Sequence, residues 1–184
     1  MKLHFKMKDF FMKAELNYIW RRRSVRSFTG EMLTDEHYSE LLQAAMAAPS
    51  ARCCDPWEFI VVRDRETLKK LVQFLPNGPF LAECGGAIIV CGNLKKAYIE
   101  SLSYMLQDCT AALENILLAA PALGLGSCWL GIHPREERIA ALREFFELPE
   151  ELIPVGACAL GFPAQESEMR TRFNPEKIHE NKWN

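Results

Sequence analysis

Residues 98–132 read YIESLSYMLQDCTAALENILLAAPALGLGSCWLGI and contain the longest helix that the sequence predicts, over residues 98–122. Its apolar residues recur at helical spacing but cover more than one stripe, so we expect this helix to be central and largely buried. Pro121 would disturb its last turn, and Gly124 and Gly126 would end it. The stretch therefore predicts a core helix against which the rest of the chain packs.

Helical periodicity alternates with short β-branched or aromatic runs on both sides of this helix. The other predicted helices cover residues 8–23, 35–48, 65–75 and a segment that begins at Pro134. The first would turn Phe11, Leu16 and Ile19 inward, and the second would have Thr34 as its N-cap. The predicted strands cover residues 57–63, 86–92, 127–132 and 152–161. Such a mixture is either α/β or α+β, and periodicity alone does not choose between them.

The composition is that of an ordinary globular protein. The chain has 184 residues, of which 49% are hydrophobic and 25% are charged. A chain of this length buries roughly 70% of the surface that its unfolded form exposes, so it needs no disulfide or metal to hold a core. We expect a single domain over residues 1–184, with a helical extension at 1–19 and a polar tail at 164–184. A net charge of −2 gives the chain as a whole no attraction for nucleic acid or anionic lipid.

The seven cysteines are an odd number for a disulfide framework and include no C-x-x-C pair. Most lie in apolar runs, where a free cysteine behaves as a small hydrophobic residue. The exception is the adjacent pair Cys53 and Cys54, which could be reactive thiols if their pKa were lowered. The first residues lack the apolar core of a signal peptide, and no apolar run approaches about 20 residues. We therefore expect a reduced, cytoplasmic protein without a membrane span.

The densest positive cluster lies at residues 21–28, where the predicted N-terminal helix ends. Arg22 and Arg26 are four residues apart, so on a helix both guanidinium groups would lie on one side, with the Ser24 hydroxyl between them. Arginine binds phosphate oxygens through planar pairs of hydrogen bonds. The alternative is a basic helix end that only water solvates, and charge alone favours that interpretation.

Arg170 and Arg172 lie in the polar tail and would point the same way in an extended segment. A solvated tail is the plain interpretation, but arginines from both ends of the chain would together neutralise a phosphate dianion. Residues 124–131 carry three glycines that would allow a flat ligand to approach or would simply end a helix. They do not form a dinucleotide fingerprint, and Trp129 is by default a core residue.

Other chemistries have little support in the sequence. The four histidines are scattered singly, and neither a zinc-protease motif nor a nucleophile elbow occurs. Classical hydrolysis is therefore disfavoured, and we expect no metal site.

Five motifs, in their order and spacing, resemble the short FMN-dependent nitroreductase family from about Trp20 to Trp183. They are Arg22-Arg23-Ser24-Val25-Arg26-Ser27-Phe28, Ala48-Pro49-Ser50-Ala51 leading to Pro56-Trp57-Glu58-Phe59, residues 107–115, residues 124–131, and Ala159-Leu160-Gly161-Phe162-Pro163 before the arginines of the tail. The resemblance implies an α+β fold with a central, mainly antiparallel sheet flanked by helices. It also implies a homodimer with FMN sites at the subunit interface.

The resemblance further implies which residues bind FMN. The phosphate would be held by Arg22, Ser24, Arg170 and Arg172, with Arg23 beside them and Arg26 toward the ribityl chain and the pyrimidine edge. The partner subunit would supply Pro49, Ser50 and Ala51, with Cys53 nearby. Trp129, Leu130 and Gly131 would lie along the flavin ring.

This chain departs from the family at two positions shortly before Pro56-Trp57. Cys53 and Asp55 stand where the family usually has Asn and Gln, so an amide is lost and a negative charge is gained. Flavin tuning, or the substrate that is accepted, is therefore expected to differ from close relatives. Pro121, where relatives often have His, is interpreted as a packing change.

The function that the resemblance implies is an FMN-dependent NAD(P)H oxidoreductase. It would pass electrons in a ping-pong cycle to a nitroaromatic, quinone or related small acceptor. The cofactor would supply the chemistry, so no side chain is expected to be catalytic. The alternatives are a specialised flavoenzyme of the same fold (a dehydrogenase, dehalogenase or flavin-fragmenting enzyme) and a flavin-binding protein without turnover.

Overall fold

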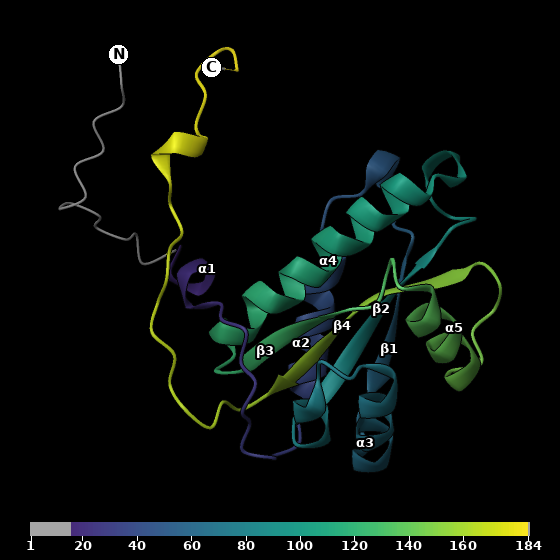
Figure 1. Ribbon diagram of the computed structural model, residues 1–184, viewed down its shortest axis with the longest axis vertical. Coiled ribbons are helices and arrows are strands. Elements are labelled where there is room, and N and C mark those ends of the chain that lie inside the picture. The colour runs from purple at the N-terminus through teal and green to yellow at the C-terminus, as the bar shows by residue number, and fades with distance from the viewer. Residues whose placement is uncertain (1–15, 184) are drawn as a thin grey trace.

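The computed structural model describes residues 16–183, and its centre is a four-stranded sheet (Figure 1). The strands are β1 (Trp57–Val62), β2 (Gly86–Asn93), β3 (Gly126–Gly131) and β4 (Leu152–Gly161). They lie in the order β1-β2-β4-β3, and each neighbouring pair is antiparallel. Each of the four strands predicted from the sequence is present, with ends within one residue of those expected.

Helices cover both faces of the sheet. The helices α2 (Asp35–Met46) and α4 (Leu102–Ala122) pack on one face, and α3 (Arg65–Phe74) and α5 (Glu136–Phe145) pack on the other. Along β2, Ile88 and Val90 belong to the first core, whereas Ile89 and Cys91 belong to the second. A sheet that is buried on both faces explains why its central strands are continuous apolar runs. The fold is thus the α+β arrangement that the resemblance implies.

The helix α4 is central and largely buried, as its sequence predicts, but it starts later than expected. Ile99 and Glu100 have φ near +50°, which a helix does not allow, so residues Tyr98–Glu100 form a separate 3-10 turn, η4. At the other end, Pro121 lies in the last turn, and Gly124 adopts a left-handed conformation with φ of +72°. Within residues 16–183, neither α4 nor any other helix is long and apolar enough to cross a membrane.

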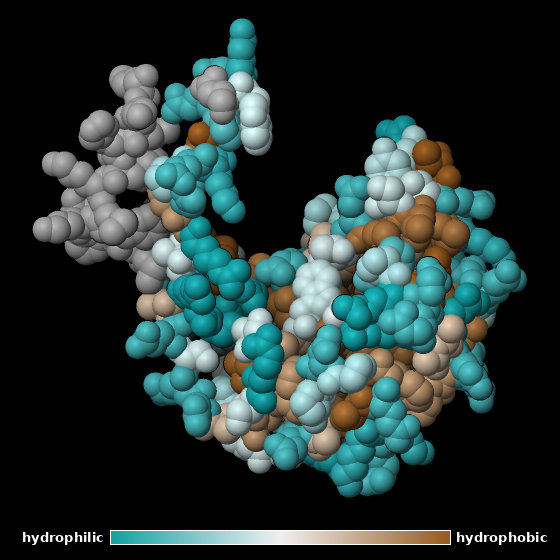
Figure 2. Space-filling model, viewed as in Figure 1, coloured by the Kyte–Doolittle hydropathy of each residue, from teal (hydrophilic) through white to brown (hydrophobic). Residues whose placement is uncertain are grey.

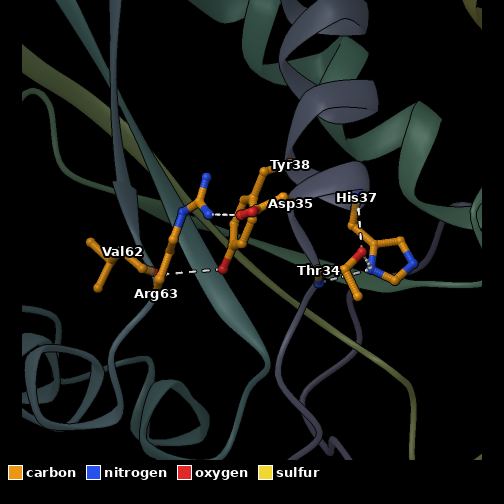
Figure 3. A network of polar contacts seen from close by, with 6 residues as sticks. All are labelled: Thr34, Asp35, His37, Tyr38, Val62 and Arg63. Atoms are coloured by element: carbon orange, nitrogen blue, oxygen red, sulfur yellow. Dashed lines mark hydrogen bonds and ion pairs between the residues drawn. The ribbon is translucent and has the colours of Figure 1, made fainter.

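The start of α2 is capped as the sequence predicts (Figure 3). The Thr34 hydroxyl accepts the backbone N–H of His37 at 3.4 Å, and His37 Nδ1 accepts the backbone N–H of Thr34 at 3.2 Å. Two backbone donors that the first turn would leave unpaired are satisfied in this way. Asp35, in the same turn, forms an ion pair with Arg63, which follows β1. This ion pair ties the helix to the end of the edge strand.

Tyr38 continues this connection into the core. Its side chain is 1% exposed, and its hydroxyl donates to the Val62 carbonyl at 3.5 Å. The Arg63 guanidinium lies 4.5 Å from the centre of the ring (Figure 3). Burial raises the pKa of Tyr38 to about 12.

Two glycines of β2 allow helices to approach the sheet closely. A Cβ added to Gly86 would overlap the Tyr38 hydroxyl, and one added to Gly92 would lie about 2.5 Å from the Met105 side chain. A side chain at residue 86 would therefore collide with Tyr38, and one at residue 92 would require the Met105 side chain to shift.

Two further predictions about helices are wrong. The helix α5 begins at Glu136 rather than at Pro134, because the Arg135 N–H bonds to the Ile132 carbonyl and closes a turn over residues 132–135. The first described helix, α1 (Asn17–Arg21), has no buried residue, and Leu16 and Ile19 are exposed rather than inward. It lies beside α4, not on the sheet. Residues 8–15, including Phe11, lie outside the described part of the chain.

The polar tail runs alongside the segment that follows α1. The Ala164 N–H donates to the Ser27 carbonyl at 3.0 Å, and the Arg170 N–H donates to the Trp20 carbonyl at 3.1 Å. Figure 1 shows the yellow tail passing the purple α1 before it turns away from the sheet. Segments from opposite ends of the chain are thereby brought together.

Candidate functional site

A pocket of about 530 Å³ lies where these two segments meet, and we call it the arginine pocket. It is lined by Ile19, Trp20, Arg22, Arg23, Ser24, Arg26, Glu114, Leu118, Arg170, Thr171 and Arg172. Six of the residues that the resemblance assigns to FMN are among them. In Figure 2 this side of the molecule, around the tail and the segment after α1, is strongly hydrophilic.

Residues 22–26 reach the pocket without being helical, which corrects the assumption that Arg22 and Arg26 share a helix face. The helix α1 ends at Arg21, and Ser24 forms an isolated parallel bridge with Ser127 of β3. In such a segment alternate side chains point to the same side, so the arginines at 22 and 26 still meet around Ser24. The Val25 N–H donates to the Ser127 carbonyl at 2.9 Å and fixes the segment on the sheet edge.

Arg23 occupies a different place from its neighbours. Besides lining the arginine pocket, it lines a second hollow of about 380 Å³ on the side of the segment where Val25 and Gly126 lie. Arg23 thus lies between the two hollows.

The tail contributes Arg170 and Arg172 by the same alternation. The hydrogen bond from Arg170 N–H to Trp20 sets the tail beside the start of the pocket. Within residues 16–183, no hydrogen bond occupies the side chains of Arg22, Arg170 or Arg172. Their donors are available to an anion.

The electrostatics of the pocket are strongly positive. Five arginines line it, and Glu114 of α4 is the one acidic residue among its described lining residues. Glu114 Oε1 lies 3.9 Å from Arg22 Nε. Burial raises the pKa of Glu114, and the Arg22 charge acts against this rise. Planar guanidinium donors converging on one space, together with the Ser24 hydroxyl, suit a phosphate group.

The second set of residues that the resemblance assigns to FMN lies in the loop after α2. The loop contains the 3-10 turn η2 (Ala51–Cys53), in which Arg52 and Cys53 have φ of 57° and 55°. The Ala51 N–H donates to Asp108 Oδ1 of α4 at 3.0 Å, and the Ser50 hydroxyl donates to the Asp55 carboxylate. Pro49, Ser50, Ala51 and Cys53 do not line the arginine pocket of their own chain.

The third set of residues that the resemblance assigns to FMN lies on β3, an edge strand of the sheet. Trp129 is 36% exposed and Gly131 is exposed, whereas the Leu130 side chain is 4% exposed and belongs to the core. A ligand on this edge would therefore meet Trp129 and the backbone of residues 130 and 131. The expectation that Trp129 is a core residue by default is wrong.

Sequence reasoning missed Glu114 and Asp108. Both lie within the motif on the long helix, but neither was given a role, because a charged residue in an apolar helix does not show which partner it meets. Asp108 is 6% exposed and contacts the loop after α2, and Glu114 faces the pocket two turns later. The available signal was the presence of two acidic residues in a mostly apolar helix.

The cysteines and the acidic residues build no further centre in the described structure. The seven cysteines are free, and Cys53 is the exposed one. Within residues 16–183, no group of three His, Cys, Asp or Glu side chains is placed to hold a metal ion.

Comparisons with known proteins cover nearly the whole chain. The model of the Nitroreductase family matches residues 19–80 and 74–162. A protein of Archaeoglobus fulgidus, provisionally named NADH dehydrogenase/NAD(P)H nitroreductase, is 46% identical over 175 residues, which are 94% of this chain and 100% of that protein. The crystal structure of a protein with the same provisional name from Parabacteroides distasonis has a TM-score of 0.86 at 37% identity, and the match covers 93% of this chain and 99% of the other. An FMN-dependent nitroreductase of Clostridium difficile has a TM-score of 0.83 at 28% identity over 91% and 99% of the two chains.

Proposed function

The chain belongs to the nitroreductase family, and from this membership we propose that it is an oxidoreductase that uses FMN and takes electrons from NADH or NADPH. Relatives carry names that include NAD(P)H nitroreductase, FMN reductase and FMN-dependent nitroreductase. All three names describe oxidoreductases; the first two include a nicotinamide nucleotide, and the last two include FMN. They differ in the acceptor.

The arginine pocket is the observation that carries this proposal. FMN ends in a phosphate that is dianionic at neutral pH, and such a group is bound best by several guanidinium donors. Five arginines and one serine line a single pocket here, although they come from residues 22–26 and 170–172. The residues present therefore fit the phosphate end of FMN. Arg26, at one end of this set, is proposed to lie toward the ribityl chain and the pyrimidine edge.

We assign the remaining contacts to two further groups. Trp129 and the backbone of residues 130 and 131, on an open sheet edge, would lie along the ring. Pro49, Ser50, Ala51 and Cys53 lie in an exposed loop that does not reach the arginine pocket of its own chain, which agrees with their coming from a second subunit. The site is thus proposed to be complete only in a homodimer.

Bound FMN would supply the redox chemistry by accepting a hydride equivalent from the nicotinamide and passing its electrons to a second substrate. The protein holds the phosphate through its arginines and keeps positive charge beside the flavin by means of Arg26. No acidic or basic side chain is assigned a proton-transfer step. Donor and acceptor are proposed to bind in turn, in a ping-pong cycle, with a nitroaromatic, quinone or related small molecule as acceptor.

One observation favours a specialised reaction as the second candidate. The Ser50 hydroxyl, which resemblance assigns to the flavin, is bonded to Asp55, where the family has a neutral Gln. A carboxylate at this place changes both the charge near the ring and the freedom of Ser50. A specialised flavoenzyme of the same fold would use that change.

An anaerobic titration tests the function directly. The purified protein, reconstituted with FMN, is mixed with NADH or with NADPH, and the flavin absorption is followed before a quinone is added. We expect the nicotinamide to bleach the flavin and the quinone to restore its colour. A protein that binds FMN without bleaching would be a binding protein, and one that cannot be reconstituted would not be a flavoprotein.

A variant tests the assignment of the phosphate site. Arg172→Gln removes one charged donor and should weaken FMN binding about tenfold or more, since hydrogen bonds to charged groups contribute about 1.5–3 kcal/mol. Arg135→Gln, at the N-cap of α5 and outside the pocket, is the matched control and should bind as the unaltered chain does. The measurement is FMN fluorescence quenching on flavin-free protein. Equal affinity in both variants would contradict the site.

A further inference from the structure

Glu114 has no role in the site as proposed so far. It projects from α4 into a pocket where every other charged lining residue is an arginine. Its carboxylate lies 3.9 Å from Arg22 Nε, which is beyond hydrogen-bond distance. The pair is therefore electrostatic, and the two side chains can separate without breaking a hydrogen bond.

Two opposing effects act on the Glu114 carboxylate when no anion is bound: burial raises its pKa, and the Arg22 charge acts against this rise. Arg22, Arg23, Arg26, Arg170 and Arg172 line the same pocket, and guanidinium groups keep their charge at any relevant pH. Cys158 of β4 interacts electrostatically with Glu114, and burial raises the pKa of its thiol, so it stays neutral. Glu114 is the one acidic residue among the described lining residues of the pocket, and its ionised carboxylate offsets repulsion among the arginines.

When a phosphate is bound, the negative charge of Glu114 becomes unfavourable instead of favourable. The dianion needs the same arginines, and it brings two negative charges into a pocket that already holds one. Like charges at such distances repel each other, and this repulsion is strongest where the surroundings are partly shielded from water. Side-chain exposures of 34% for Arg22 and 43% for Glu114 describe such a half-buried place.

We propose that Glu114 competes with the flavin phosphate for Arg22 and so weakens the hold of the protein on FMN. This inference rests on the proposed FMN site and adds an element to it. Glu114 stabilises the empty pocket and speeds release of the phosphate, which makes the flavin exchangeable rather than permanently bound. The residue acts on affinity through the phosphate end, not on the reaction at the ring.

The test compares two flavins that differ only in the phosphate. Flavin-free protein at constant low ionic strength is titrated with FMN and with riboflavin, and the dissociation constants are read from fluorescence quenching. Glu114→Gln should tighten FMN binding about threefold to tenfold, since 1.4 kcal/mol corresponds to tenfold, and should leave riboflavin binding unchanged. Glu137→Gln, exposed on α5, makes the same change in net charge away from the pocket and should alter neither.

Each other result overturns the inference in a recognisable way. Weaker FMN binding by Glu114→Gln would show that Glu114 positions Arg22 for the phosphate, and an equal gain for both flavins would show that it does not act through the phosphate. Unchanged FMN binding would show that it is inert. If neither the unaltered chain nor either variant binds a flavin, the proposed function itself fails. Equal melting temperatures for the unaltered chain, Glu114→Gln and Glu137→Gln exclude misfolding as the reason.

Discussion

Cys53 and Cys54 are the cysteines that solvent reaches. Cys53 is exposed and Cys54 is half-buried, whereas the other five are buried: Cys84, Cys91, Cys109, Cys128 and Cys158. Burial raises the pKa of Cys91 and of Cys109 to about 12. Because the thiolate is the reactive form, these buried thiols are inert at neutral pH.

This contrast predicts two classes of thiol. In flavin-free protein at neutral pH, an aromatic disulfide reagent should modify Cys53 first and Cys54 more slowly, and the other five only after denaturation. The absorbance of the released thiol gives both rates and amounts. Cys53→Ser should remove the fast phase, and a third thiol reacting rapidly in the native protein would contradict the burial described.

At the level of single residues, the sequence identified the arginines that line the arginine pocket but gave the acidic residues Glu114 and Asp108 no role. The arginines could be found because they cluster in two short segments with a spacing of two or four. Glu114 and Asp108 could not, because their partners lie about 60 to 90 residues away and are defined by packing alone. The basis on which Arg22 and Arg26 were paired was also wrong, since the chain leaves the helix at Arg21.

At the level of elements, the contact between α2 and β1 depends on the neutral form of Tyr38. Its pKa is about 12 in the folded chain, against 10.0 for an unperturbed tyrosine, so the unfolded state loses the proton first as pH rises. The free energy of unfolding should therefore fall by about 2 to 3 kcal/mol between pH 10 and pH 12, and be unaffected by this group below that range.

Urea unfolding at a series of alkaline pH values measures this effect. Tyr38→Phe keeps the ring between Gly86 and Arg63 but cannot ionise, so its stability should decline less steeply over the same range. Parallel curves for the two proteins would show that the hydroxyl ionises equally in both states. Comparison with the variant also removes the contribution of other groups that titrate there.

The elements themselves were largely predictable, and the exceptions have local causes. Apolar runs fixed the strands because both faces of the sheet are buried, and Thr34 marked the start of α2 through its cap. The turn that delays α5 and the left-handed residues before α4 depend on backbone contacts that no periodicity records. The family resemblance predicted a mainly antiparallel sheet, but the order β1-β2-β4-β3 was not predicted, because strand pairing is a long-range property.

At the level of the whole molecule, the end of the tail projects away from the sheet (Figures 1 and 2). Ile178 is 47% exposed and Trp183 is 87% exposed, although both are apolar or aromatic. Near the start of α4, Ile99 is 72% exposed and Leu102 is 42% exposed. Apolar surface of this kind suits contact with a second subunit, and a net charge of −2 offers little repulsion to such contact.

We therefore expect a dimer that depends on the tail. A chain shortened after Asn174 keeps Arg170 and Arg172 but lacks Ile178 and Trp183, and it should dissociate at a higher concentration than the full chain. Sedimentation velocity over a dilution series measures this. Lys177→Gln leaves the apolar residues in place and serves as the control. A full chain that sediments as a monomer at every concentration would contradict the dimer.

The two glycines beneath Tyr38 and Met105 have a consequence for how β2 finds its position between β1 and β4. Hydropathy does not discriminate between alignments of this strand, because a shift by one residue would exchange one apolar side chain for another on each buried face. Steric fit does discriminate. A slip of one residue would bring Cys91 or Asn93 under Met105 in place of Gly92, so the absence of a side chain at residue 92 favours the correct alignment.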